Sequence, residues 1–349
     1  MDFSFQGLVQ QHAAQMDAAF RSLVDTIVRS SKLNIALLRI SNVTEHSFHV
    51  SLEARITKTG PASASITPMT VDLCGPSGHF GNVTLPAITT QAYGTNVVVT
   101  NQLVHIIDKE ALKAFIQAII QDGVVLSLRN GRTSITALGV GPREIVYEKE
   151  IALPGMRGPA VSVHAASLLP NPLSSSSTAS LSTTRSLITT RSSSSTASAA
   201  GGGNAVSIVL HVANPSPVEV SFGTCSFDIQ DHEGRLVAEL KGRLDIRRDQ
   251  FEGTFQGSVN KAVAAKLAAD VREAGGSKAG KGDGRAPEAR LVGRRCAGAG
   301  WCDETVKGIN VPLQHASRLF RALGMDDGME EPEEERSGFT TWTDRFMMR

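Results

Sequence analysis

The sequence is poor in aromatic residues, in cysteine and in net charge. Only 5% of its 349 residues are aromatic, and the four cysteines, none in a C-x-x-C pair, are Cys74, Cys225, Cys296 and Cys302. The formal net charge is +1. Nucleic-acid modules built on sheets need stacked aromatic rings and a basic face, so the composition predicts no nucleic-acid partner. The cysteine spacing argues against a zinc site and is compatible with a reducing compartment.

Long apolar runs are missing as well. Residues 1–10 contain Asp2 and no basic start of a secretory signal, and no apolar run reaches about 18 residues. The sequence as written therefore predicts a cytoplasmic protein without a membrane-spanning helix.

A strand motif that occurs twice is the strongest positive signal. Residues 37–52 and 208–222 each read as an apolar strand, an asparagine, a short polar corner and a second strand with alternating apolar positions. Alternation with a period of two places one face of a strand in a core. The asparagines, Asn42 and Asn214, are interpreted as turn formers.

Residues 1–32 are predicted to form an amphipathic helix. Apolar side chains recur at spacings of three and four, namely Phe5, Leu8, Val9, Met16, Phe20, Leu23, Val24, Ile27 and Val28. Contact with a membrane surface would need a strongly basic opposite face, and this face is mixed. Packing against the first domain is the favoured alternative.

Residues 33–158 are predicted to form a first β-sandwich. Within it, Asp108 to Gln121 reads as an amphipathic helix with Asp108 as N-cap. The dipeptide Asn130-Gly131 lies between two strand-like runs and predicts a two-residue hairpin turn, because it supplies positive φ angles.

The remaining chain is divided by composition. Residues 159–203 are rich in Ser, Thr and Ala and are predicted to be a flexible linker, with regulatory phosphorylation as the alternative. Residues 204–325 repeat the order of strands, helix and strands, which indicates an internal duplication and a second sandwich. Residues 275–300, rich in Gly and Arg, are predicted to be a disordered insertion, too polar for a core strand, and could be a gene-model artefact. Thr305 to Leu313 then reads as a strand, and residues 326–349 as a solvated acidic tail.

No reactive constellation emerges from the sequence. Gly275 to Lys281 fits G-x-x-x-x-G-K, but Gly282 stands where a phosphate-binding loop needs Ser or Thr, and a helix instead of a strand precedes it. Asp228 and Asp231 are explained by a hairpin corner. The dispersed histidines form no metal motif; those considered are His79, His105, His164, His211 and His232. We predict no catalytic, cofactor-binding or metal-binding residue and no cofactor.

A series of short motifs suggests a relationship. In order they are Leu33-Asn34-Ile35, Ile40-Ser41-Asn42-Val43-Thr44, Ser47-Phe48, Gly60-Pro61, Phe80-Gly81, Leu85-Pro86, Lys149 and Leu153-Pro154-Gly155, with a looser counterpart in Val209 to Pro215. They resemble a fungal family of uncharacterised proteins similar to group 2 late embryogenesis abundant proteins, the LEA14-like or water-stress-hypersensitive domain. The resemblance implies a fibronectin-like sandwich with one helix per copy and no catalytic residue. Family members often carry an N-terminal membrane anchor and face a vacuolar or other lumen, which would apply here if an anchor is missing.

The sequence thus predicts a mainly β protein. It would consist of two tandem fibronectin-like β-sandwiches, each with one helix, after an N-terminal helix. The expected function is that of a non-enzymatic binding or scaffold protein. Its candidate partners are a lipid, another apolar ligand, a membrane surface or a membrane-associated partner. An apolar ligand would bind between the sheet and the helix. The alternatives are an accessory protein or motif-less cyclase of a fungal secondary-metabolite pathway, and a stress-protective protein. Whether the protein has any catalytic activity is left open.

Overall fold

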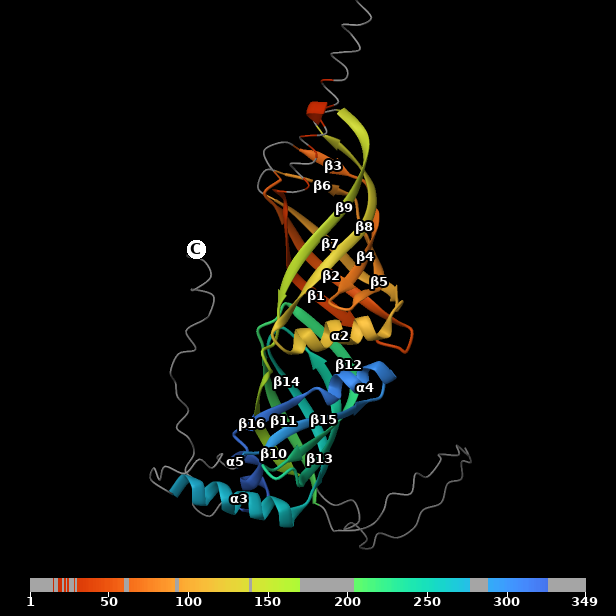
Figure 1. Cartoon of the computed structure of the whole chain (residues 1–349). Helices are drawn as coiled ribbons and strands as arrows, with labels where there is room; N and C mark the ends of the chain where they lie inside the picture. Colours follow the sequence, from red (N-terminus) through yellow and green to blue (C-terminus); the bar gives the residue numbers. More distant parts are fainter. Residues whose placement is uncertain are drawn as a thin grey trace, which may run out of the picture.

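The fold was analysed in a computed structural model of the whole chain (Figure 1). It describes residues 30–59, 63–91, 94–137, 140–169, 204–276 and 288–325, and before them Gln15, Ala18 to Phe20, Ser22, Val24 and Val28.

The first unit consists of two sheets that face each other. Three strands, β1, β2 and β7, are one end of a ten-stranded sheet, and the second sheet has the order β5-β4-β8-β3-β6 with β9 paired to β8. The bounds are β1 (Lys32–Ser41), β2 (Ser47–Thr57), β3 (Ala64–Ile66), β4 (Met69–Gly75), β5 (Gly78–Leu85), β6 (Ile88–Thr89), β7 (Thr95–His105), α2 (Lys109–Ile120), β8 (Gly123–Ala137) and β9 (Val140–Pro154).

The second unit is a closed barrel of seven strands. Its strands follow the order β13-β14-β11-β10-β16-β15-β12, and β12 pairs with β13 to close the ring. The bounds are β10 (Ala160–Leu168), β11 (Asn204–Asn214), β12 (Val218–Gln230), β13 (Leu236–Ile246), β14 (Asp249–Val259), α3 (Lys261–Gly276), β15 (Arg290–Cys296), α4 (Gly300–Lys307), β16 (Asn310–Gln314) and α5 (Ser317–Ala322).

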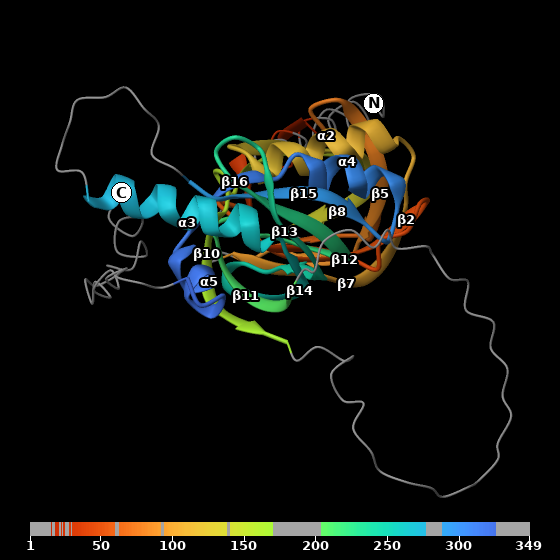
Figure 2. The same ribbon diagram turned by 90° about the horizontal axis from the view of Figure 1, so that it is seen from below.

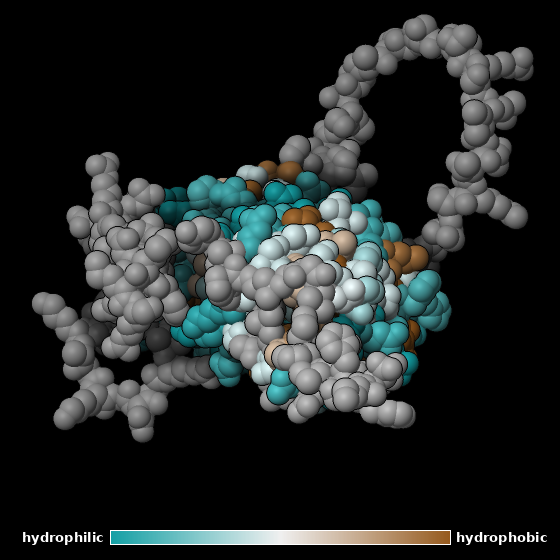
Figure 3. Space-filling model, turned by 90° about the horizontal axis from the view of Figure 1, so that it is seen from above, coloured by the Kyte–Doolittle hydropathy of each residue, from teal (hydrophilic) through white to brown (hydrophobic). Residues whose placement is uncertain are grey.

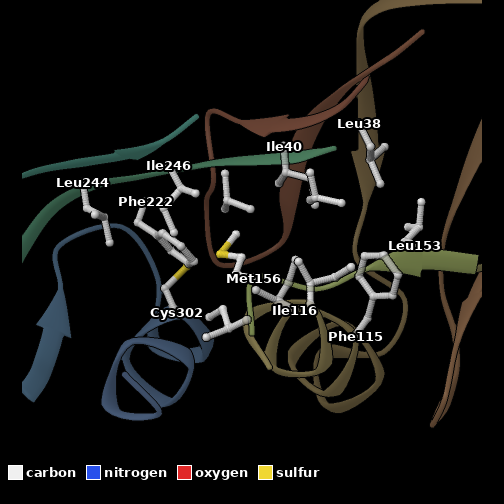
Figure 4. Packing of buried hydrophobic residues seen from close by; sticks show 14 of the residues in the cluster. Leu38, Ile40, Phe115, Ile116, Leu153, Met156, Phe222, Leu244, Ile246 and Cys302 are labelled. Atoms are coloured by element: carbon white, nitrogen blue, oxygen red, sulfur yellow. The ribbon is translucent and has the colours of Figure 1, made fainter. Parts of the chain in front are cut away.

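The two units share one sheet and one core. Strand β1 of the first unit pairs in parallel with β12 of the barrel, with Leu38 opposite Val218 and Ile40 opposite Val220. Helices α2 and α4 lie next to each other at this junction, on the side of the molecule opposite β2 and β7 (Figure 2). Figure 4 shows Met156 between side chains of the two units, so no solvent layer separates the cores.

Helix α2 is held by a cap and by burial. The Asp108 carboxylate accepts hydrogen bonds from the backbone N–H groups of Glu110 (2.9 Å) and Ala111 (3.1 Å), as the sequence predicted. Its apolar face is at most 6% exposed and consists of Ala111, Leu112, Phe115, Ile116, Ile119 and Ile120. The helix therefore closes the core with its own side chains.

The predicted N-terminal helix is confirmed at the residues that can be described. These residues are helical between Gln15 and Ser30, and Phe20 and Val24 are buried in the common core. Lys149 donates from Nζ to the backbone oxygens of Val28 and, at 2.7 Å, of Ser31, which satisfies carbonyls at the end of the helix. Burial lowers the pKa of Lys149.

The mainly β class is confirmed, but the second half is a barrel where a sandwich was predicted. The predicted linker 159–203 begins too early, because Ala160–Leu168 is strand β10 and lies between β11 and β16 of the barrel. Residues 170–203 and the acidic tail 326–349 lie outside the described residues. The second unit thus starts at β10, before the linker, and a strand with only two buried residues, Val161 and Val163, was mistaken for linker.

The prediction that residues 275–300 form a disordered insertion was wrong for the last part of this range, which contains strand β15. Strand β15 pairs with β12 and β16 in the barrel wall. Its sequence Arg-Leu-Val-Gly-Arg-Arg-Cys buries Leu291, Gly293 and Cys296 and turns its arginines outward. A Cβ on Gly293 would lie 1.9 Å from the Val306 oxygen, so the glycine permits the close approach of α4. A high arginine and glycine content therefore did not exclude a core strand.

The predicted hairpin at Asn130-Gly131 was also wrong. Strand β8 continues through both residues, and its register with β9 shifts between Leu128 and Gly131. Asn130 has a φ of 57°, so the positive φ serves a β-bulge and not a turn. Likewise Thr305 to Leu313 is not one strand, because helix α4 occupies Gly300–Lys307 before β16 begins.

The internal duplication is not supported by the structure. The first unit has two separate sheets, whereas the strands of the second form one ring that is closed by the pairing of β12 with β13. Helix α2 lies at the junction of the units, and α3 lies beside α5 at the lower end of the barrel (Figure 1). The asparagine corners do act as predicted: Asn42 has a φ of 49°, and the buried Asn214 amide donates to the backbone oxygens of Val218 and Arg247.

Candidate functional site

The continuous sheet presents one long outer face across the boundary between the units. Strands β13, β12, β1, β2 and β7 are neighbours, and the side chains that alternate with the core positions point away from both cores. We call this surface the outer sheet face and define it by Arg243, Asp245, Arg247, Glu219, Ser221, Arg39, Ser41, His49, Ser51, Glu53, Val98 and Leu103.

A cluster of arginines and acids lies where β1 meets β12. The Glu219 carboxylate accepts hydrogen bonds from Arg39 Nε (2.7 Å) and from the backbone N–H of Arg248 (3.3 Å). Glu219 is only 8% exposed in its side chain, while Arg39 is 51% exposed. The acid is therefore covered, and the guanidinium group faces solvent.

The same arrangement, an exposed arginine above a more covered acid, recurs on the neighbouring strand β13. Arg243 Nε lies 2.8 Å from Asp245 Oδ2, and Ser221 donates its hydroxyl hydrogen to the same carboxylate. Arg243 is 72% exposed and Asp245 29%. Together with Arg247, these groups line a hollow of about 360 Å³, which we call the arginine hollow. Its solvent side is dominated by positive charge.

Two large apolar side chains occupy the other end of the outer sheet face. Val98 is 54% and Leu103 46% exposed on β7. They are an odd number of residues apart, so regular alternation would place them on opposite faces. An irregularity at Asn101 prevents this: its φ is 47°, its N–H is bonded to Ser51 Oγ at 2.9 Å, and the register shifts beside it. The bulge thus brings both side chains to the outer face.

His49 lies between these two ends. It is opposite Ser41 on β1 and opposite Leu103 on β7. Its ring Nδ1 is buried and has no hydrogen-bond partner within the described part of the chain. Buried polar atoms without partners are uncommon in folded proteins.

The groups that the sequence singled out do not converge on a site. Asp231 accepts backbone N–H bonds from Glu233 (2.9 Å) and Arg235 (2.8 Å) in its turn, and Asp228 pairs with Arg294 across the barrel wall. Hydrogen bonds from Arg235 and Glu233 outweigh the effect of burial and hold the pKa of Asp231 below its ordinary value. The histidines lie on separate strands and loops. His164 lies near Glu252 (3.7 Å), and His79 bonds within its own hairpin.

Sequence reasoning missed the arginine hollow and the apolar pair on β7. The alternation in residues 37–52 implied that Arg39 faces outward, but it carried no signal that β1 adjoins β12, and no strand was predicted at Leu103. In the described ranges, no group of three or more His, Cys, Asp and Glu side chains is arranged to hold a metal ion, and no helix is long and apolar enough to span a membrane. Figure 3, seen from above, shows teal and pale coloured atoms with only small separate brown areas.

Comparison with known proteins identifies a domain but no activity. Residues 78–229 match a family described as a protein of unknown function (DUF3712). The match begins in β5 and ends in β12, so it includes strands of both units. No curated protein matches the chain. The resemblance to LEA14-like proteins and to a fungal source stays a prediction.

One solved structure that is similar to the chain is the exo-chitosanase CsxA of Amycolatopsis orientalis. The identity is 12% and the TM-score 0.18, with 76% of this chain covered. The chain spans 25% of that protein. A likeness of this size supports no statement about fold or function.

Proposed function

We propose that the protein is a non-enzymatic binding scaffold whose outer sheet face binds an acidic segment of a partner protein. The observation that carries the proposal is the layering of charge in the arginine hollow. The arginines reach solvent and the acids lie beneath them, on the same face as the exposed Leu103 and Val98.

The chemistry of this face suits a carboxylate-rich partner with an apolar anchor. Guanidinium groups bind carboxylates through two parallel hydrogen bonds, and Arg39 and Arg243 use only part of their donor capacity on Glu219 and Asp245. Protein interfaces combine apolar anchors with arginine and a polar rim. Leu103 is such an anchor, with His49 and Ser51 beside it.

The shared sheet supports a scaffold role. Because β1 and β12 are paired and the core is continuous, the arginine hollow and the apolar end are held at a fixed separation. A preformed face loses little conformational entropy when it binds. The space between α2 and its sheet is filled by the helix's own side chains, so we place the partner on the surface and not between helix and sheet.

The test compares two positions of similar exposure on different faces. A photo-crosslinking amino acid replaces Leu103 on the outer sheet face or Val146 on β9, which is 59% exposed. Crosslinking is performed in the cells from which the protein derives. We expect a discrete protein adduct at 103 and none of that mass at 146. Equal adducts at both positions, or none at 103, would overturn the proposal.

Charge reversal tests the partner's chemistry. The crosslinked protein is purified, and its dissociation constant is measured for wild type, Arg243→Glu and Arg132→Glu, the last on the β8 surface. We expect Arg243→Glu to weaken binding at least about tenfold and added salt to weaken wild-type binding, while Arg132→Glu has little effect. Binding of the chain to vesicles containing anionic lipid, lost in Arg243→Glu, with no protein adduct at 103, would instead make a membrane surface the partner.

A further inference from the structure

Three of the four cysteines of the chain meet inside the barrel. Cys225 lies on β12, Cys296 on β15 and Cys302 in the first turn of α4. They are 0%, 7% and 0% exposed, and all are free thiols. Figure 4 shows Cys302 against Phe222 at the end of the barrel core. Cys74 is the fourth and lies on β4 of the other unit.

The register of β12 and β15 places Cys225 and Cys296 directly opposite each other. The neighbouring pair, Thr224 and Ala297, is joined by a backbone hydrogen bond, because Ala297 donates its N–H to the Thr224 oxygen at 2.7 Å. Hydrogen-bonded and non-hydrogen-bonded pairs alternate along an antiparallel ladder, so Cys225 and Cys296 are a pair without mutual backbone hydrogen bonds. In such antiparallel pairs the Cα atoms are about 4.5 Å apart and the side chains close. This separation lies within the range of about 4.4 to 6.8 Å that a disulfide requires.

Cys302, on helix α4, contacts the Cys296 thiol as well. The Cys296 thiol and the backbone N–H of Cys302 approach the same acceptor, the Ala299 oxygen, at 3.9 and 3.1 Å. Hydrogen bonds from the thiols of Cys225 and Cys302 lower the pKa of Cys296, and the same bonds raise the pKa of both donors. Cys296 is also next to the exposed residues Ala297 and Gly298, so it is the most accessible of the three.

We propose that Cys225 and Cys296 form a reversible disulfide between β12 and β15, with a peroxide as oxidant. The Cys296 thiolate attacks one peroxide oxygen and becomes a sulfenic acid, and the other oxygen leaves as hydroxide and takes up a proton as water. The Cys225 sulfur then attacks the Cys296 sulfur, and the sulfenic oxygen leaves as water with the Cys225 proton. Two thiols and one hydrogen peroxide thus give one disulfide and two waters.

The position of this bond gives it a consequence for the fold. Strand β12 also carries the parallel pairing to β1, so a covalent link from β12 to β15 ties the barrel wall to the strand that joins the units. A disulfide of this kind constrains the unfolded chain and raises the Tm of the oxidised protein.

The test uses the full chain, oxidised with a small excess of hydrogen peroxide, alkylated under denaturing conditions and digested without reductant. Trypsin leaves Cys296 and Cys302 on one peptide, because it cleaves after Arg295 and Lys307. Wild type and Cys302→Ser are therefore analysed together by mass spectrometry. We expect a linked peptide containing Cys225 in both proteins, lost on adding dithiothreitol, and a higher Tm after oxidation.

Controls separate this site from general oxidation. Cys74→Ser should give the same linked peptide as wild type, while Cys225→Ser and Cys296→Ser should not give it. The proposal is overturned if all four wild-type thiols remain alkylatable or if Cys296 becomes sulfinic acid without a linked peptide. A Cys296 to Cys302 bond, seen as an internal link in wild type and absent in Cys302→Ser, also overturns it. Wild type alone decides the first two outcomes, so they do not depend on the folding of a variant.

Discussion

Trp301 of the barrel donates its indole N–H to the backbone oxygen of Thr44 in the first unit, at 3.1 Å. The neighbouring residues reinforce this contact: the Glu45 carboxylate accepts from the Gly300 N–H at 2.8 Å and pairs with Lys109 of α2. The hydrogen bonds from Lys109 and Gly300 hold the pKa of Glu45 below its ordinary value. The loop after β1 thus fastens α4 to α2, opposite the outer sheet face.

Replacing Trp301 is expected to weaken both units together. Trp301→Phe keeps most of the apolar volume and removes the indole donor, which should lower the free energy of unfolding by about 1 kcal/mol. Trp301→Ala should cost about 3 to 5 kcal/mol, because the side chain is buried. The measurement is urea unfolding followed by far-UV circular dichroism, with Val146→Ala as an exposed control. Two separate transitions in wild type would contradict the continuous core.

The β-bulge in β8 provides a prediction about two adjacent residues. A Cβ on Gly131 would lie 2.8 Å from Val71 Cγ1 and 3.0 Å from the Tyr147 oxygen, so Gly131→Ala should destabilise the protein by about 1 to 3 kcal/mol. Asn130→Gly should change stability by no more than about 1 kcal/mol, since glycine tolerates the φ of 57°. Thermal unfolding of both variants measures this. Equal losses would contradict the close packing of Val71 and the Tyr147 oxygen around Gly131.

This bulge also illustrates how far the sequence could be interpreted. Asn-Gly correctly indicated a positive φ, but a bulge and a hairpin use the same local chemistry, and only the partner strand decides between them. Helix α2 was predictable because its cap, apolar face and end are all local. The pairing of β1 with β12 joins segments that are far apart in the sequence, so the layering of Arg39 over Glu219 left no local signal.

Tyr147 on β9 is expected to make the protein sensitive to alkaline pH. Burial raises the pKa of its hydroxyl to about 12, whereas an unfolded tyrosine ionises near about 10. The neutral form is favoured in the folded state, so this contribution to stability is complete below about pH 10 and is lost between about pH 10 and 12. At pH 11 the loss should be about 1.4 kcal/mol, which corresponds to one pH unit above the unfolded value. Urea unfolding of wild type and Tyr147→Phe at pH 8 and pH 11 measures it, because only wild type should show this loss. If both proteins lose the same free energy between the two pH values, Tyr147 is not the group responsible.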